Sequence, residues 1–177
     1  MVSLNGIKSS IENILTAISD SFHIEAAVFD SECKLLVCTQ KYLIRKGRVV
    51  HTPSIEEVLK NGNILVNKPG FMPSCAGCRF KDQCPSTIEI LNSIKVDNEP
   101  IGVISLTSFT NEGQRRLTKN INTYLGILQE VSDLISIFAT SRNPENSNHT
   151  IVQHIMNMSS DCFLAIDPNG IIEHSNA

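Results

Sequence analysis

The sequence predicts an α+β fold: an antiparallel sheet, flanked by an N-terminal and a C-terminal helix, that carries a cysteine-bearing loop. Apolar residues recur every three or four positions near residues 4–22 and again over 117–140, which is the spacing of one helix face. Between these two segments, short apolar runs alternate with turn residues, a pattern typical of hairpins. An irregular stretch, residues 69–85, holds three of the six cysteines.

The size and charge of the chain limit what it can do. With 177 residues, 41% of them hydrophobic, it can bury one full domain and little more. A formal net charge of -3 provides no basic field for a phosphate backbone, so we expect no direct nucleic-acid binding. No run approaches the roughly 20 apolar residues that cross a bilayer, and the N-terminus lacks a leader pattern. We therefore expect no membrane association and a cytoplasmic location.

The N-terminal half predicts a helix, a hairpin, a second helix and a strand. The first helix covers residues 4–20, and residues 24–38 form two short apolar runs around a polar break, which predicts a β-hairpin. Residues 53–62 begin with proline and serine and end in glycine, as a short capped helix does. Residues 64–66 are then a short strand.

A second hairpin follows the cysteine-rich stretch. Residues 88–96 and 101–109 are apolar runs joined by Asp97-Asn98-Glu99-Pro100, whose residue types suit a tight reversal. Because both strand pairs are hairpins, we expect an antiparallel sheet.

The last segment of this domain predicts a long helix over residues 117–140, which contains no proline. One face of it is apolar at steps of four and three, with Tyr124, Leu128, Val131, Ile135 and Phe138. This stripe fits packing on the domain's own sheet and equally the seam of a coiled coil. The first helix has a similar stripe, so both readings together predict a homodimer through helices 4–20 and 117–140.

The C-terminal residues predict a linker and the start of another domain. Residues 143–149 are polar and contain a proline, as linkers do. Residues 150–177 include the run CFLAIDPNGIIEHSNA, a strand, an Asp/Asn/Gly turn and a second strand, which resembles the beginning of a PAS domain. One hairpin cannot bury a core, so we expect the natural chain to continue. The predicted domains are residues 1–142, the linker 143–149 and the truncated PAS domain 150–177.

The cysteine-rich stretch predicts a metal or redox site. Cys75, Cys78 and Cys84 form a C-x2-C-x5-C-P cluster, and Gly77 lets the backbone curl between the first two thiols. We expect Cys38 as the fourth ligand, with Cys33, His51 or an exogenous group as alternatives. Equally, Cys38 could be a small core residue, as free cysteine often is.

Thiolate ligands of this kind serve both iron-sulfur clusters and zinc. The proline after the last cysteine is typical of ferredoxin-type loops, and the spacing is similar to that of the oxygen-sensing fumarate and nitrate reduction regulators, which implies a 4Fe-4S cluster. Structural zinc and redox-active or merely structural thiols stay open as alternatives.

A longer resemblance spans roughly residues 24–140. FDSECKLLVCTQKY and CAGCRFKDQCPSTIEILNSIKVDNEPIGVISLTSFTNEGQRRL resemble the N-terminal sensory domain of sigma-54-dependent, Fis-type transcriptional activators. The resemblance implies a GAF/PAS-like fold and an input domain that answers a redox, oxygen or small-molecule signal. The chain departs from the family pattern at residues 38–40 and 91–93, which bears on the ligand pocket but not on the cysteine loop.

The sequence does not predict an enzyme. It contains no phosphate-binding glycine loop, no Gly-x-Ser-x-Gly and no HExxH, and its five histidines are scattered. A thiol oxidoreductase using Cys75 and Cys78 is disfavoured, since this pair is not expected at a helix N-terminus after a strand. The remaining alternative is an interaction module in which zinc pins the loop and the helices dimerise.

Overall fold

The computed structural model describes residues 3–48, 52–140, 164–166 and 172–175. Contacts along the chain divide it into two units, Met1–Thr140 and Ser141–Ala177. The first contains the sheet, the helices and the cysteine loop.

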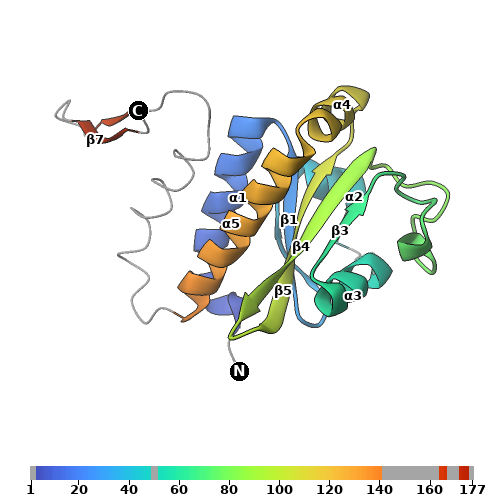
Figure 1. Ribbon diagram of the computed structural model, residues 1–177, viewed down its shortest axis with the longest axis horizontal. Helices are drawn as coiled ribbons and strands as arrows, with labels where there is room; N and C mark the ends of the chain where they lie inside the picture. The colour runs from blue at the N-terminus through green and yellow to red at the C-terminus, as the bar shows by residue number, and fades with distance from the viewer. Residues whose placement is uncertain (1–2, 49–51, 141–163, 167–171, 176–177) are drawn as a thin grey trace. The chain divides into compact units, whose positions relative to one another are not determined.

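The centre of the first unit is a five-stranded sheet in the order β2-β1-β5-β4-β3, in which every neighbouring pair is antiparallel (Figure 1). The strands are β1 (Glu25–Asp30), β2 (Leu35–Cys38), β3 (Asn63–Val66), β4 (Ile88–Val96) and β5 (Glu99–Ser108). Both predicted hairpins are confirmed. Asp97 and Asn98 take φ values of 50° and 70°, the left-handed conformation that a two-residue reversal requires.

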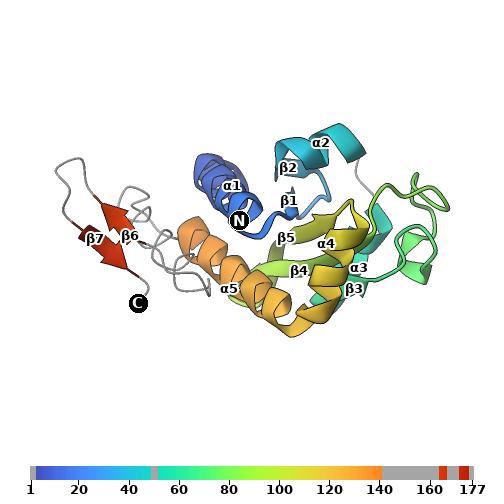
Figure 2. The same cartoon turned by 90° about the horizontal axis from the view of Figure 1, so that it is seen from above.

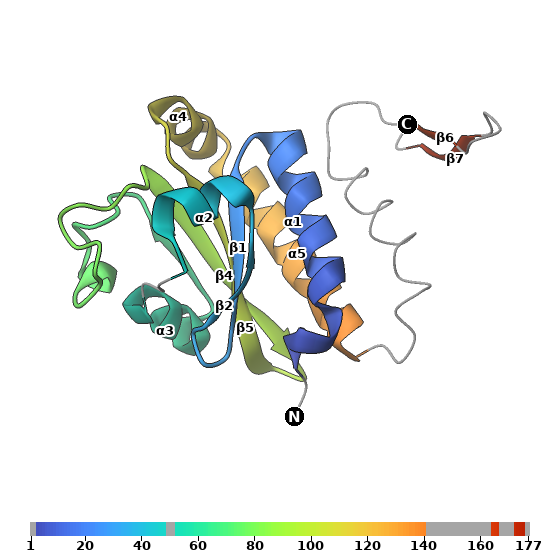
Figure 3. The ribbon, with the colours of Figure 1, turned by 180° about the vertical axis from the view of Figure 1, so that it is seen from behind.

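Two long helices cover one face of this sheet, as Figures 2 and 3 show. They are α1 (Lys8–Phe22), preceded by the 3-10 turn η1 (Leu4–Ile7), and α5 (Ile121–Thr140). The apolar stripes predicted on both helices are buried apart from the half-buried Ile7. These side chains therefore form the core of their own domain.

The other face of the sheet is covered by α2 (Gln40–Lys46), α3 (Thr52–Asn61) and the loop between β3 and β4. A compact apolar cluster fills this side: Ala27, Phe29, Tyr42, Ile55, Val58, Val66, Cys75, Leu91 and Val103. Helix α2 is absent from the sequence prediction, because its seven residues are too few to show a helical period.

The predicted helix over residues 117–140 is wrong at its start. The structure has two helices, α4 (Asn111–Lys119) and α5, which part at Asn120. The Thr110 side chain accepts a hydrogen bond from the Gly113 amide and caps α4, while Asn120 leaves helical geometry with ψ at 33°. The apolar stripe begins only beyond this break.

The second unit is described only at β6 (Leu164–Ile166) and β7 (Ile172–Ser175), which pair antiparallel. This confirms the two predicted strands, and the predicted turn between them lies outside the described residues. The predicted linker and the helix before β6 lie outside the described residues, and the assignment of residues 150–177 to a PAS domain stays a prediction.

Candidate functional site

The cysteine loop folds over the sheet face that carries α2 and α3, and it encloses a small cavity. Three of the four predicted ligands, Cys75, Cys78 and Cys84, line this cavity of about 10 Å³, the space of about one water molecule. The remaining lining residues come from α2, α3, β3, β4 and the loop itself: Lys46, Ser54, Val66, Pro69, Gly70, Phe80 and Glu89.

Gly70 joins the two halves of the loop. Its amide donates to the Cys75 Sγ at 3.2 Å, and its carbonyl accepts from the Asp82 amide at 3.1 Å. Its φ is +90°, and a Cβ at this position would lie only 3.2 Å from the Phe80 carbonyl oxygen and 3.3 Å from the Cys84 Cβ. Gly70 is thus packed against both Cys75 and Cys84 with a left-handed backbone, and this position favours glycine.

The C-x2-C turn presents its sulfurs to backbone donors. The Cys78 amide donates to the Cys75 carbonyl at 3.0 Å, which closes the turn after η2 (Pro73–Cys75). The Phe80 amide donates to the Cys78 Sγ at 3.3 Å. The Gly70 amide bonds the Cys75 sulfur in the same way, so Cys75 and Cys78 each accept a peptide N–H. Such bonds orient metal-binding thiolates and offset their negative charge.

A buried ion pair forms the inner wall of the cavity. The Lys46 ammonium of α2 contacts the Glu89 carboxylate of β4, and each residue is only 2% exposed. The Lys46 Nζ also lies 5.5 Å from the centre of the Tyr42 ring and 5.9 Å from that of Phe80. The ammonium is thus placed between the sheet, α2 and the loop. Burying an ion pair in this way carries a desolvation cost, which the attraction between the two charges has to offset.

Burial and neighbouring charges shift the pKa values of two groups beside the ion pair, Cys84 and Tyr42. Burial raises the pKa of the Cys84 thiol, with Lys46 acting to lower it and Glu89 to raise it. Burial also raises the pKa of the Tyr42 hydroxyl well above its usual range, reinforced by the negative charge of Glu89 and by the cysteines Cys38, Cys84 and Cys78. At neutral pH both groups are therefore protonated.

The predicted fourth ligand, Cys38, lines a different cavity. It ends β2, packs against the apolar cluster under α2, and shares a pocket of about 150 Å³ with Leu43 and Arg48. Burial raises the pKa of its thiol, and Arg48 opposes the rise. Of the alternatives, Cys33 lies at the β1–β2 turn with φ of 63°, and His51 lies outside the described residues.

Among the residues that the structure describes, no three His, Cys, Asp or Glu side chains are arranged to hold a metal ion. The three loop thiols line one cavity without converging on a common point. Metal binding by the loop therefore stays a prediction.

Lys46, Glu89 and Tyr42 were not identified as site residues from the sequence. Lys46 and Glu89 are 43 positions apart, and no spacing rule connects them. One signal was available, since Glu89 interrupts the apolar run Ile88–Leu91. A charged residue inside a buried strand needs a partner, although the sequence does not say which one.

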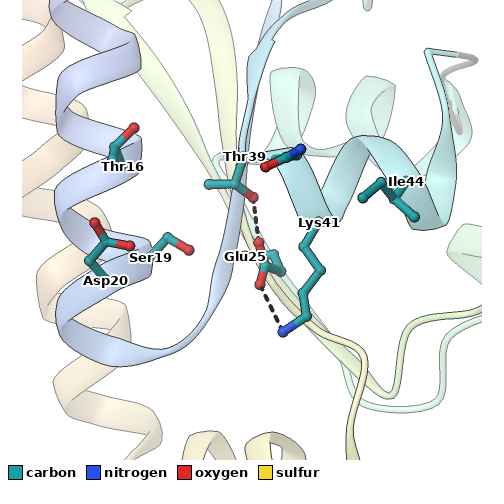
Figure 4. A pocket seen from close by; sticks show the side chains of 8 residues that line it. Thr16, Ser19, Asp20, Glu25, Thr39, Lys41 and Ile44 are labelled. Atoms are coloured by element: carbon teal, nitrogen blue, oxygen red, sulfur yellow. Dashed lines mark hydrogen bonds and ion pairs between the residues drawn. The ribbon is translucent and has the colours of Figure 1, made fainter.

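A larger groove of about 560 Å³ lies between α1, β1 and α2 (Figure 4). There the Thr39 hydroxyl donates to the Glu25 carboxylate at 2.7 Å, and the Lys41 Nζ lies 3.7 Å from the same carboxylate. Thr16, Ser19 and Asp20 of α1 face them across the opening. The groove is open and contains no thiol, so we place the candidate site at the cysteine cavity.

Comparison with known proteins gives one curated relative and several solved structures. No family model matches the chain. The chain is 22% identical over 170 residues to a protein of Escherichia coli whose name describes it as a uric acid sigma-54-dependent transcriptional regulator, UacR. The match covers 93% of this chain and 29% of the relative, so the chain spans less than a third of that protein's length.

The structural matches are to proteins of low sequence identity. A type II free methionine-R-sulfoxide reductase from Thermoplasma acidophilum superposes with a TM-score of 0.52 at 16% identity, over 77% of this chain and 95% of that one. The GAF domain of A. aeolicus nlh2 covers 70% of this chain and 85% of its own, with a TM-score of 0.47 and 16% identity. None of the described helices has both the length and the apolar character needed to cross a membrane. The first unit therefore has an α+β fold similar to that of the free methionine-R-sulfoxide reductase, and the chain is similar in sequence to a sigma-54-dependent transcriptional regulator.

Proposed function

We propose that this chain is the signal-sensing input domain of a sigma-54-dependent transcriptional regulator, and that the cysteine loop receives the signal. The sequence similarity over most of the chain supports the input role. The observation that carries the proposal is the position of three loop cysteines around one cavity whose inner wall is the buried Lys46–Glu89 pair.

Cys75, Cys78 and Cys84 would hold the metal or cluster through their sulfurs. The donor set fits, because thiolates are the ligands of zinc and of iron-sulfur clusters, and two of the sulfurs already accept backbone N–H bonds. A cavity of about 10 Å³ is smaller than a 4Fe-4S cluster, so cluster binding requires the loop to open. Cys38 becomes the fourth ligand only if β2 or the loop moves; otherwise an exogenous group completes the site.

Strand β4 provides the route from this site to the output helix. Glu89 lies on the face of β4 that lines the cavity, and Asn92 lies on the opposite face, since side chains alternate along a strand. There the Asn92 amide donates to the Ser132 hydroxyl at 3.0 Å and to the Gln129 side chain at 3.2 Å, both on α5. A displacement of β4 at the cavity is thus passed directly to α5.

The test is anaerobic purification of the chain, followed by an absorption spectrum and by iron, zinc and sulfide analysis. We expect bound metal that is lost in Cys78→Ala and retained in Cys33→Ala, a matched control at the β1–β2 turn outside the cavity. A broad visible absorption that air bleaches, with equal iron and sulfide, identifies an iron-sulfur sensor. A colourless protein with about one zinc per chain identifies a structural site. Absence of both metals from the wild type contradicts the metal-based sensor.

The same preparation tests two alternatives. If the chain binds zinc, and oxidation or reduction leaves the bound zinc unchanged, the chain is an interaction module in which zinc stabilises the loop. The similarity to a methionine-R-sulfoxide reductase, together with three thiols at one cavity, favours a thiol reductase as the second candidate. Turnover of free methionine sulfoxide that depends on Cys78 would establish it; we expect none.

The partners and location of the domain follow from the same proposal. We expect a cytoplasmic homodimer without direct contact to nucleic acid, which answers a redox or small-molecule signal. The name of the relative makes urate a ligand to test. A purine is far larger than the closed cysteine cavity, so urate binding there would also require the loop to open.

A further inference from the structure

The groove between α1, β1 and α2 contains a carboxylate that is nearly buried and only partly hydrogen-bonded (Figure 4). Glu25, on β1, lines the groove and is 8% exposed. Its Oε2 atom accepts a hydrogen bond from the Thr39 hydroxyl at 2.7 Å. Its Oε1 atom lies 3.7 Å from the Lys41 Nζ, beyond hydrogen-bond distance, and no described residue donates a hydrogen bond to it. This oxygen is therefore available to a donor that enters the groove.

The Thr39 side chain holds the Glu25 carboxylate in place. The Thr39 hydroxyl accepts a hydrogen bond from the Ala26 amide at 3.3 Å while it donates to Glu25. The carboxylate is thus tied to the backbone of its own strand, and its direction is set before a ligand arrives. A group that is oriented in advance loses less entropy when it binds a ligand.

The walls of the groove favour a ligand that is positively charged and forms hydrogen bonds. Asp20 of α1 adds a second carboxylate across the opening from Glu25. With Lys41 as the positive lining residue, the charged side chains of the groove carry one net negative charge. Thr16 and Ser19 provide hydroxyl groups, which can both donate and accept hydrogen bonds.

The size of the groove fits a small organic molecule. Its volume is about 560 Å³, which lies within the range of small-molecule sites and far exceeds the space that a metal ion needs. Ile44 of α2 lines the same groove and is 73% exposed, so it provides apolar surface for an alkyl chain. The groove therefore combines negative charge with a contact for hydrocarbon.

The ammonium of Lys41 already occupies the place that such a ligand would take. The Lys41 side chain is 63% exposed, and it approaches the Glu25 carboxylate without a hydrogen bond. An exposed ion pair of this kind contributes little to stability, because solvent screens it. A ligand can therefore displace the Lys41 ammonium at small cost.

We propose that this groove binds a small organic compound with a primary ammonium group, which replaces the Lys41 ammonium at Glu25. The ligand ammonium donates to the Glu25 Oε1, and Asp20 adds to the negative charge that attracts it. This site goes beyond the proposed function, because it is separate from the cysteine loop and does not depend on metal binding there. A ligand bound in this way contacts both α1 and α2.

Calorimetric titration of the full 177-residue chain with 1,4-diaminobutane tests the proposal. The titration is done at low ionic strength, because salt weakens the attraction between exposed charges. The comparison compound is 1,4-butanediol, which has the same carbon chain and carries no charge. We expect saturable binding of the diamine and no binding of the diol.

Two substitutions should change the affinity for the diamine in opposite directions. Glu25→Gln keeps an acceptor for the Thr39 hydroxyl but removes the charge, and it should weaken binding about tenfold or more. Lys41→Met removes the competing ammonium and should tighten binding about two- to fivefold, as expected for an exposed ion pair. Glu99→Gln, the same exchange at an exposed position of β5 outside the groove, is the matched control and should bind like the wild type.

The outcomes distinguish a site from general attraction to an acidic chain. Absence of saturable diamine binding by the wild type overturns the proposal, and so do equal losses of affinity in Glu25→Gln and Glu99→Gln. Binding by Lys41→Met that is no tighter than that of the wild type overturns the displacement of the Lys41 ammonium. If Glu25→Gln fails to fold, Asp20→Asn at its exposed position on α1 replaces it and should weaken binding about two- to fivefold. Tighter binding by Lys41→Met, together with loss in the groove variants alone, establishes the site.

Discussion

At the scale of single residues, Gly70 determines whether the cysteine loop can close. It combines a left-handed backbone with three contacts that leave no space for a side chain. Gly77, in the same loop, has a similar φ of +80°, but its nearest neighbour is a Pro53 side-chain carbon at 3.8 Å. The two glycines thus separate the effect of backbone conformation from that of close approach.

Substitution of these glycines tests this distinction. Gly77→Ala should lower the free energy of unfolding by about 1–2 kcal/mol, the cost of a left-handed alanine. Gly70→Ala should cost more and should also loosen the loop, because backbone atoms of Phe80 and Asp82 have to move. Urea unfolding gives the free energies, and the rate of Cys75 alkylation reports loop opening. Equal effects of the two substitutions in both measurements would show that close approach at Gly70 has no role.

The residues of the site differ in how far the sequence could predict them. Cys75, Cys78 and Cys84 were identifiable because their chemistry and spacing are local, and the structure brings them to one cavity. The position of the Cys38 side chain could not be predicted. Whether a cysteine in a strand faces a loop depends on which helix lies between the strand and the loop. Here α2 places Tyr42 on that face of the sheet. The Lys46–Glu89 pair depends on the same helix.

At the scale of elements, the hairpins and α1 were predictable because apolar periodicity and turn residues determine them locally. The long C-terminal helix was predicted too simply. Residues 111–119 contain few apolar side chains, so α4 shows no stripe, and it is stabilised by its Thr110 cap and by Arg116, which donates to the His23 carbonyl at the end of α1. Such distant contacts leave no local pattern in the sequence.

The contact between β4 and α5 yields a prediction at this scale. Asn92 is 6% exposed and bonds two side chains of α5. Asn92→Ala should lower the free energy of unfolding by about 1–3 kcal/mol, since it removes two hydrogen bonds, one of them to the buried Ser132 hydroxyl. A double-mutant cycle with Ser132→Ala should give a coupling of about 0.5–1.5 kcal/mol. Asn122→Ala, at an exposed position of α5, is the control and should stay within about 0.5 kcal/mol of the wild type. A coupling near zero would mean that the bond does not link strand and helix.

At the scale of the whole molecule, the buried stripes bear on the proposed homodimer. The side chains expected to form its seam on α1 and α5 are already buried in the core of their own domain. A dimer through these helices must use their outer faces, where Ile137 of α5 is 60% exposed. The homodimer through these two helices stays a prediction, but with different contact residues.

Light scattering at micromolar concentration tests this arrangement. We expect the mass of a dimer for the wild type and a shift to monomer for Ile137→Glu, since a charge in an apolar seam is unfavourable. Phe71→Glu is the matched control, because Phe71 is 70% exposed in the cysteine loop on the other face of the sheet, and its substitution should leave the dimer intact. A monomeric wild type would remove the dimer from the proposal.

The strand order of the sheet has a mechanical consequence. The cysteine loop leaves from β3, a four-residue strand at one border of the sheet that pairs only with β4. Lifting the loop and β3 together therefore breaks a short ladder and leaves the pairing of β1, β5 and β4 intact. We therefore expect that a ligand held by the loop would be released and recaptured without unfolding of the domain, so the proposed sensor would be resettable and would not have to be replaced after each signal.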